Sequence, residues 1–76
     1  MIVIYTKYVN NLVENCVALC ETYDQEHAVI VLGVDASPQC VKPEWPLPAV
    51  VVDEKYIGGI TNLAKFLEEW DRVHGL

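Results

Sequence analysis

The sequence has few basic residues and no long apolar run. Only 5 of its 76 residues are Lys or Arg, whereas 11 are Asp or Glu, so the net charge is −6. Without a basic stripe the chain lacks the charge that binds nucleic acid, and its acidity disfavours anionic membranes. The longest apolar run, residues 28–34, is too short to span a bilayer. We therefore expect neither a nucleic-acid partner nor a membrane partner.

Cysteine is also scarce, and its count is odd. Three cysteines cannot form a complete disulfide framework, and the apolar N-terminal segment 1–4 is too short for a signal peptide. These features are typical of proteins in a reducing compartment. We therefore expect a cytoplasmic protein.

Two of the cysteines, Cys16 and Cys20, lie four residues apart on one apolar stripe. Cβ atoms at this helical spacing are about 5–6 Å apart, whereas a disulfide needs about 3.5–4.5 Å. We therefore predict buried thiols and no redox pair. Together with His27 they also lack the ligand spacing of a zinc site, so no metal is expected. Cys40, in a proline-rich segment, is the remaining candidate for a reactive thiol.

Runs of β-branched residues predict four strands in one domain, residues 1–76. The strands are expected over residues 2–6, 28–34, 49–52 and 55–57, with a tight turn at Asp53-Glu54 between the last two. Because the first strand is apolar throughout, we expect it at the centre of the sheet with both faces covered.

Two helices are predicted from apolar residues that recur every three or four positions. The first begins at a cap formed by Asn10 or Asn11 and ends near Tyr23. The second is capped by Thr61 or Asn62 and ends at a C-terminal glycine, Gly75. Prolines between residues 37 and 47 leave room for at most one helical turn, around residues 39–42, with Trp45 either anchoring this loop or exposed as a contact residue.

Three segments together resemble the glutaredoxins, a family of the thioredoxin superfamily. Residues 2–7 are similar to the opening strand of that family, residues 46–53 to its cis-proline segment and third strand, and residues 55–63 to its Gly-Gly segment and last helix. The resemblance implies a thioredoxin-like α/β fold of glutaredoxin type, β-α-β-β-β-α. It also implies a four-stranded mixed sheet in the order 2-1-3-4, a cis Pro48, and a middle helix that is shortened or absent.

The chain departs from the family at the positions that carry its chemistry. On this resemblance, Asn10 and Val13 stand where glutaredoxins have the two cysteines of Cys-x-x-Cys. Neither side chain forms the low-pKa thiolate that thiol–disulfide exchange requires, so we lean against catalysis. The resemblance also places Lys7 beside the lost thiolate and Asn62 where many members have an Asp that meets the amino group of glutathione.

The function predicted from these features is a catalytically inactive glutaredoxin-like binding module. It would hold a protein or peptide partner in the former substrate groove, with the backbone of Leu47 pairing with an extended ligand. The predicted groove residues are Lys7, Tyr8, Asn10, Val13, Leu47, Pro48, Gly58, Gly59, Thr61 and Asn62.

Two alternative functions remain open from the sequence. One is a thiol-disulfide oxidoreductase that uses Cys40, and the other is a non-catalytic domain that binds glutathione, the only candidate cofactor. For Gly58 and Gly59 a purely structural interpretation also stands, because the turn from the last strand into the last helix needs conformational freedom.

Overall fold

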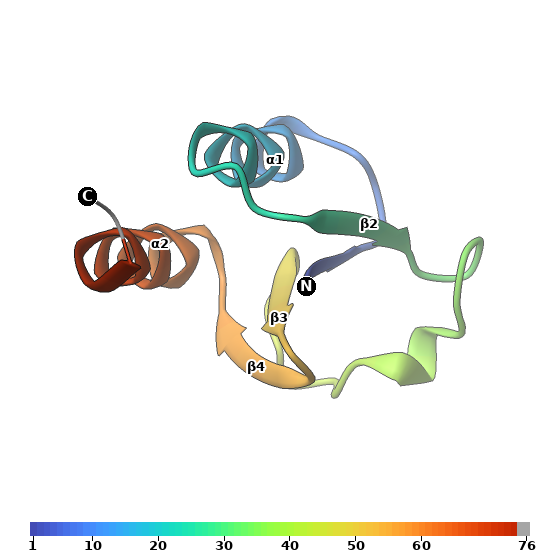
Figure 1. Cartoon of the computed structure of the whole chain (residues 1–76). Helices are drawn as coiled ribbons and strands as arrows, with labels where there is room; N and C mark the ends of the chain where they lie inside the picture. The colour runs from blue at the N-terminus through green and yellow to red at the C-terminus, as the bar shows by residue number, and fades with distance from the viewer. Residues whose placement is uncertain (75–76) are drawn as a thin grey trace.

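A four-stranded mixed sheet with two helices forms the fold, in a computed structural model that describes residues 1–74 (Figure 1). The strands are β1 (Ile2–Thr6), β2 (His27–Val31), β3 (Ala49–Val52) and β4 (Lys55–Gly58). Their order is β2-β1-β3-β4, with β1 parallel to β2 and antiparallel to β3. The predicted strand order and the central position of β1 are therefore confirmed.

The first helix, α1 (Asn11–Thr22), begins where the sequence predicts. Asn10 is the N-cap, since its backbone is extended and its side-chain oxygen accepts a hydrogen bond from the Val13 N–H at 3.1 Å. Tyr23, expected near the helix end, lies directly after the last helical residue.

The second helix, α2 (Ile60–His74), begins earlier than predicted. The expectation that Thr61 or Asn62 caps it is wrong, because the Leu63 N–H already bonds to the Gly59 carbonyl at 3.0 Å. The predicted C-terminal glycine, Gly75, lies outside the described residues. Within residues 1–74 no helix is long and apolar enough to cross a membrane.

Strand β2 is shorter than the predicted 28–34. The chain turns away after Val31, whose carbonyl accepts hydrogen bonds from the N–H groups of Val34 and Asp35 at 3.1 and 2.7 Å. Gly33 adopts φ +86°, which a side chain disfavours, and this conformation completes the turn. The proline-rich segment then contains one 3₁₀ turn, η1 (Pro38–Cys40). The prediction of a single helical turn is therefore confirmed, but the turn begins one residue earlier than the predicted range 39–42.

The hydrophobic core lies between the helices and one face of the sheet. Alternate strand residues such as Ile2, Ile4 and Val50 pack with Leu63 and Leu67 of α2. Both helices lie on this side of the sheet, whereas the segment between β2 and β3 extends along the other side (Figure 1). This arrangement leaves the second face of the sheet without a helix.

The expectation that β1 is covered on both faces is therefore wrong. Val3 and Tyr5, which point to the second face, are only half-buried. Trp45 covers part of that face by stacking on Tyr56 of β4, with ring centroids 4.1 Å apart and planes 4° from parallel. Trp45 is thus a loop anchor, one of its two predicted roles.

Candidate functional site

The predicted groove residues meet at one end of the sheet. Tyr5 pairs with Ala49 and Val50 with Gly58, so the end of β1, the start of β3 and the end of β4 lie together. Both helices also begin here, because α1 follows β1 and α2 follows β4. We call this region, residues 7–12, 47–48 and 58–62, the junction end. The positive ends of two helix dipoles face it.

The β1–α1 connection, residues 7–10, holds no cysteine. The side-chain oxygen of Asn10 is engaged as the helix cap, and Val13 is 1% exposed within the core. The Thr6 hydroxyl donates to the Tyr8 carbonyl at 2.8 Å and shapes the exit from β1. Asn10 therefore caps the helix and Val13 fills the core, and the apolar accessible surface belongs to their neighbours.

Those neighbours are apolar and exposed. Tyr8, Val9 and Leu12 are 75%, 62% and 48% exposed, and they are three of the six large hydrophobic side chains most exposed among residues 1–74. Neither Val9 nor Leu12 is among the groove residues predicted from the sequence, because Leu12 follows the apolar spacing of α1 that is typical of buried positions. Leu12 stands in the first helical turn, where the stripe extends beyond the neighbours that could cover it.

The segment before β3 presents an unpaired backbone. Leu47 is half-buried, and the structure shows no hydrogen bond to its N–H or carbonyl within the described residues. The Leu47–Pro48 peptide bond is cis, as the resemblance implies. Gly59 lies close to Pro48, because a Cβ added at Gly59 would be 3.9 Å from the Pro48 carbonyl oxygen. These residues form the inner wall of the junction end.

Gly58 has a structural role at this end. Its φ is +125°, and a Cβ added there would lie 2.7 Å from Cγ of Asn62. Only glycine fits under both constraints. The side chains of Thr61 and Asn62 are exposed in the first turn of α2, and that of Asn62 packs over Gly58.

A cavity of about 470 Å³ adjoins the junction end at Lys7. Lys42 and Trp45 also line it, together with Pro38, Gln39, Val41 and Pro43. Two of the five basic residues of the chain thus face one cavity, and no acidic residue of the described part of the chain lines it. The sequence pointed to Lys7 but not to Lys42, because only the folded loop brings the two together.

The three cysteines differ in accessibility, and the prediction that Cys16 and Cys20 are buried is confirmed. Both are fully buried core thiols, and Cys40 is exposed. Burial raises the pKa of Cys16, and burial, with smaller contributions from Cys16 and Glu21, raises the pKa of Cys20 to about 11. Neither thiol is poised for thiolate chemistry. Residues 1–74 contain no cluster of three or more His, Cys, Asp or Glu arranged to hold a metal.

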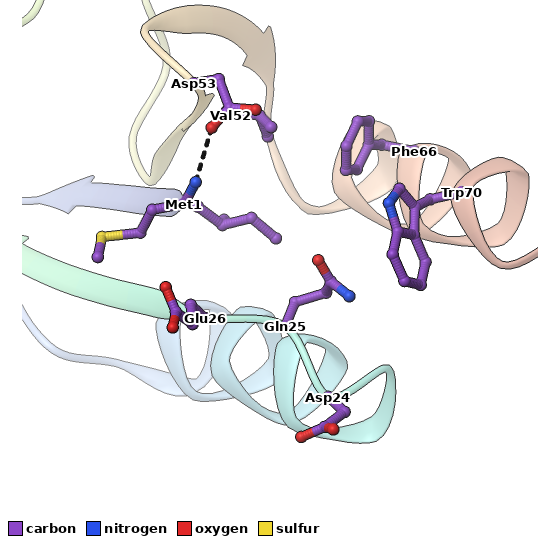
Figure 2. Close-up of a pocket in the computed structure, with 9 residues that line it drawn as sticks. Met1, Asp24, Gln25, Glu26, Val52, Asp53, Phe66 and Trp70 are labelled. Carbon is purple, nitrogen blue, oxygen red and sulfur yellow. Dashed lines mark hydrogen bonds and ion pairs between the residues drawn. The ribbon is translucent and has the colours of Figure 1, made fainter. Parts of the chain in front are cut away.

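A further cavity, of about 340 Å³, lies at the opposite end of the sheet (Figure 2). Phe66 and Trp70 of α2 face it, and the Met1 ammonium bonds to a carboxylate oxygen of Asp53 at 2.7 Å. Both partners of this ion pair are largely exposed, so the pair adds little stability. None of the predicted site residues lies there.

Comparison of the chain with protein-family models, with curated proteins and with solved structures found no match in any of the three.

Proposed function

We propose that this protein is a catalytically inactive binding module with a small thioredoxin-like fold of glutaredoxin type, which holds an extended segment of a protein partner at the junction end. The carrying observation is the group of exposed apolar side chains, Tyr8, Val9 and Leu12, where the resemblance calls for a redox centre. Contiguous exposed apolar surface is typical of interaction sites, and burying each such side chain contributes roughly 1.5–3 kcal/mol.

The backbone of Leu47 supports an extended ligand. Its N–H and carbonyl, which have no partner among residues 1–74, stand just before β3 at the junction end. An extended peptide can pair with such groups by main-chain hydrogen bonds, while its side chains occupy neighbouring pockets. The partner segment would place an apolar side chain on Tyr8 and Leu12.

The charges around the junction end favour an acidic group in the same segment. Lys7 and Lys42 line the adjoining cavity, and the two helix N-termini face the same region. In a chain of net charge −6 this is a local reversal of sign. The proposed ligand is therefore an extended segment with an apolar residue and a carboxylate.

The exposure of Cys40 favours one second candidate function, thiol–disulfide exchange through that residue. Against it, Cys40 ends the short turn η1 and does not stand at the start of a helix. A helix N-terminus is where a thiolate is stabilised in redox proteins.

Random peptides displayed on phage provide the probe for the binding proposal. We expect the selected peptides to carry apolar and acidic residues and to shift the amide resonances of residues 7–12, Leu47 and Gly59. Replacing two exposed side chains, in Tyr8→Ser with Leu12→Ser, should weaken the affinity of the selected peptides about tenfold or more. A loss of about 1.4 kcal/mol of binding free energy corresponds to a factor of ten in Kd.

The matched control is Val34→Ser with Val73→Ser, which removes apolar side chains that are 80% and 75% exposed elsewhere. This variant should bind like the wild type. Selection of no peptide, or of peptides indifferent to Tyr8→Ser with Leu12→Ser, would contradict the proposal. Glutathione-dependent disulfide reduction that disappears in Cys40→Ser would replace it with the redox function.

A further inference from the structure

Strand β2 is an open edge of the sheet. The Leu32 N–H bonds to the Thr6 carbonyl of β1 at 2.8 Å, so Val31, the preceding residue, directs its N–H and carbonyl away from β1. The Val31 N–H accordingly bonds to a carboxylate oxygen of Asp35 at 3.0 Å. By the alternation of a strand, Val29 also directs its N–H and carbonyl to the open edge. Among residues 1–74 no other strand pairs with β2 on that side, and because the Val31 carbonyl also accepts from Val34 and Asp35, Val29 is the open position of this edge.

An apolar groove runs between this edge and α1. It has a volume of about 280 Å³, and its apolar wall consists of Val9, Val13, Val17, Ala18 and Val29. Val29 therefore offers its side chain to the groove and its backbone to the edge. A strand added beside β2 would place every second side chain over the groove, at a spacing of about 6.6 Å.

The rim of the groove is acidic. Glu14 and Glu21 border it, and both are exposed. They stand seven residues apart, which is about 10.5 Å along the helix, with Val17 and Ala18 between them. The rim thus presents negative charge at both ends of an apolar centre.

From these features we infer that the β2 edge is a second docking surface, which takes a short extended segment of a protein partner with a basic residue on each side of an apolar one. The segment extends the sheet beside Val29, its apolar side chain enters the groove, and its two basic side chains meet Glu14 and Glu21. The first and fifth residues of a strand are about 13 Å apart, whereas Glu14 and Glu21 are about 10.5 Å apart along the helix. Long, flexible basic side chains bridge this difference.

Charge decides between this occupant and a second copy of the chain. Two copies paired through β2 would bring Glu14 and Glu21 of one toward the same residues of the other, and each copy carries a net charge of −6. Like charges at an interface oppose association, whereas a basic segment gains from the same residues. This surface shares Val9 with the exposed apolar group of the junction end, but it is separate from the Leu47–Pro48 wall and prefers the opposite charge.

The probe is a capped synthetic peptide, Lys-Thr-Val-Thr-Lys, titrated into isotope-labelled protein and followed by NMR. We expect shifts in the amides of Val17, Ala18, His27 and Val29 and none at Leu47 or Gly59. The peptide Glu-Thr-Val-Thr-Glu should not bind. We infer an antiparallel pairing, in which the peptide valine stands opposite Val29 and exchanges main-chain hydrogen bonds with it. Methylating the valine nitrogen should therefore weaken binding at least fivefold.

Two variants test the surface from the side of the protein. Ala18→Arg should abolish binding, since it fills the groove from an exposed helical position, and Glu14→Gln with Glu21→Gln should weaken binding about tenfold. The control Glu68→Gln with Glu69→Gln makes the same change of net charge on α2 and should bind like the wild type. Thermal unfolding of each variant verifies that it folds.

Three outcomes would overturn the inference. They are absence of binding at millimolar peptide, binding that both α1 variants leave intact, and a concentration-dependent dimer of the protein alone with shifts at residues 27–31. The last would assign the edge to a second copy. Because Tyr8→Ser with Leu12→Ser leaves this groove intact, failure here and failure at the junction end are distinguishable.

Discussion

At the scale of single residues, positions that the resemblance assigns to a redox centre have structural roles. Asn10 caps a helix, Val13 fills the core, and Gly58 makes room for Asn62. Cys16 and Cys20 lie fully buried with raised pKa values and pack as small apolar residues. Burial therefore keeps the thiols of Cys16 and Cys20 in the neutral form.

The raised thiol pKa values predict a loss of stability at alkaline pH. Below pH 9 the Cys20 thiol is neutral in both the folded and the unfolded chain. Above its ordinary pKa of 9.0 the unfolded chain loses this proton while the folded chain keeps it up to about 11. The unfolded state then binds fewer protons, so the free energy of unfolding falls as the pH rises through this window.

Urea unfolding of the wild type and of Cys16→Ala with Cys20→Ala, measured across the same pH window, checks this expectation. The variant should be less stable throughout because it leaves small cavities, but its stability should fall less steeply with pH. Tyr and Lys titrate in both proteins, so the difference in slope isolates the two thiols. Equal slopes would show that the thiols ionise alike in both states.

At the scale of elements, the apolar periodicity of the sequence predicted both helices because each buries one face, and runs of β-branched residues predicted the four strands. Asn10 was predictable as a cap from its place before an apolar stripe. The early end of β2 was not, since it depends on Gly33 and on the hydrogen bond from the Val31 N–H to Asp35. The exposure of Leu12 and the pairing of Lys7 with Lys42 depend on tertiary packing, which periodicity does not describe.

The Asn10 cap of α1 should contribute measurably to the free energy of unfolding. Asn10→Ala should lower the free energy of unfolding by about 1 kcal/mol, because the Val13 N–H loses its partner. Asn10→Ser should recover most of the loss. In contrast, Asn15→Ala, at an exposed position inside the same helix, should be neutral or slightly stabilising, since alanine has the higher helix propensity. Chemical unfolding of the three variants distinguishes a cap from a surface residue.

At the scale of the whole molecule, the sheet carries helices on one face and an irregular, proline-rich segment on the other (Figure 1). The stacked rings of Trp45 and Tyr56 fasten that segment to β4. The same segment places Lys42 beside Lys7 and leads into Leu47 at the junction end. The proline-rich segment thus supplies part of the proposed ligand wall without an α-helix of its own.

The central claim is that the junction end is a redox site whose chemistry has been lost and whose frame persists. Because the Asn10 side chain reaches the Val13 N–H, cysteines at these two positions would stand at the start of α1 as in a Cys-x-x-Cys motif. The most direct measurement is thiol alkylation and intact mass of Asn10→Cys with Val13→Cys, in a Cys40→Ser background, before and after reduction. The claim predicts one reducible disulfide between the two introduced cysteines in a folded protein. A folded variant that keeps both introduced thiols free under oxidising conditions would contradict it.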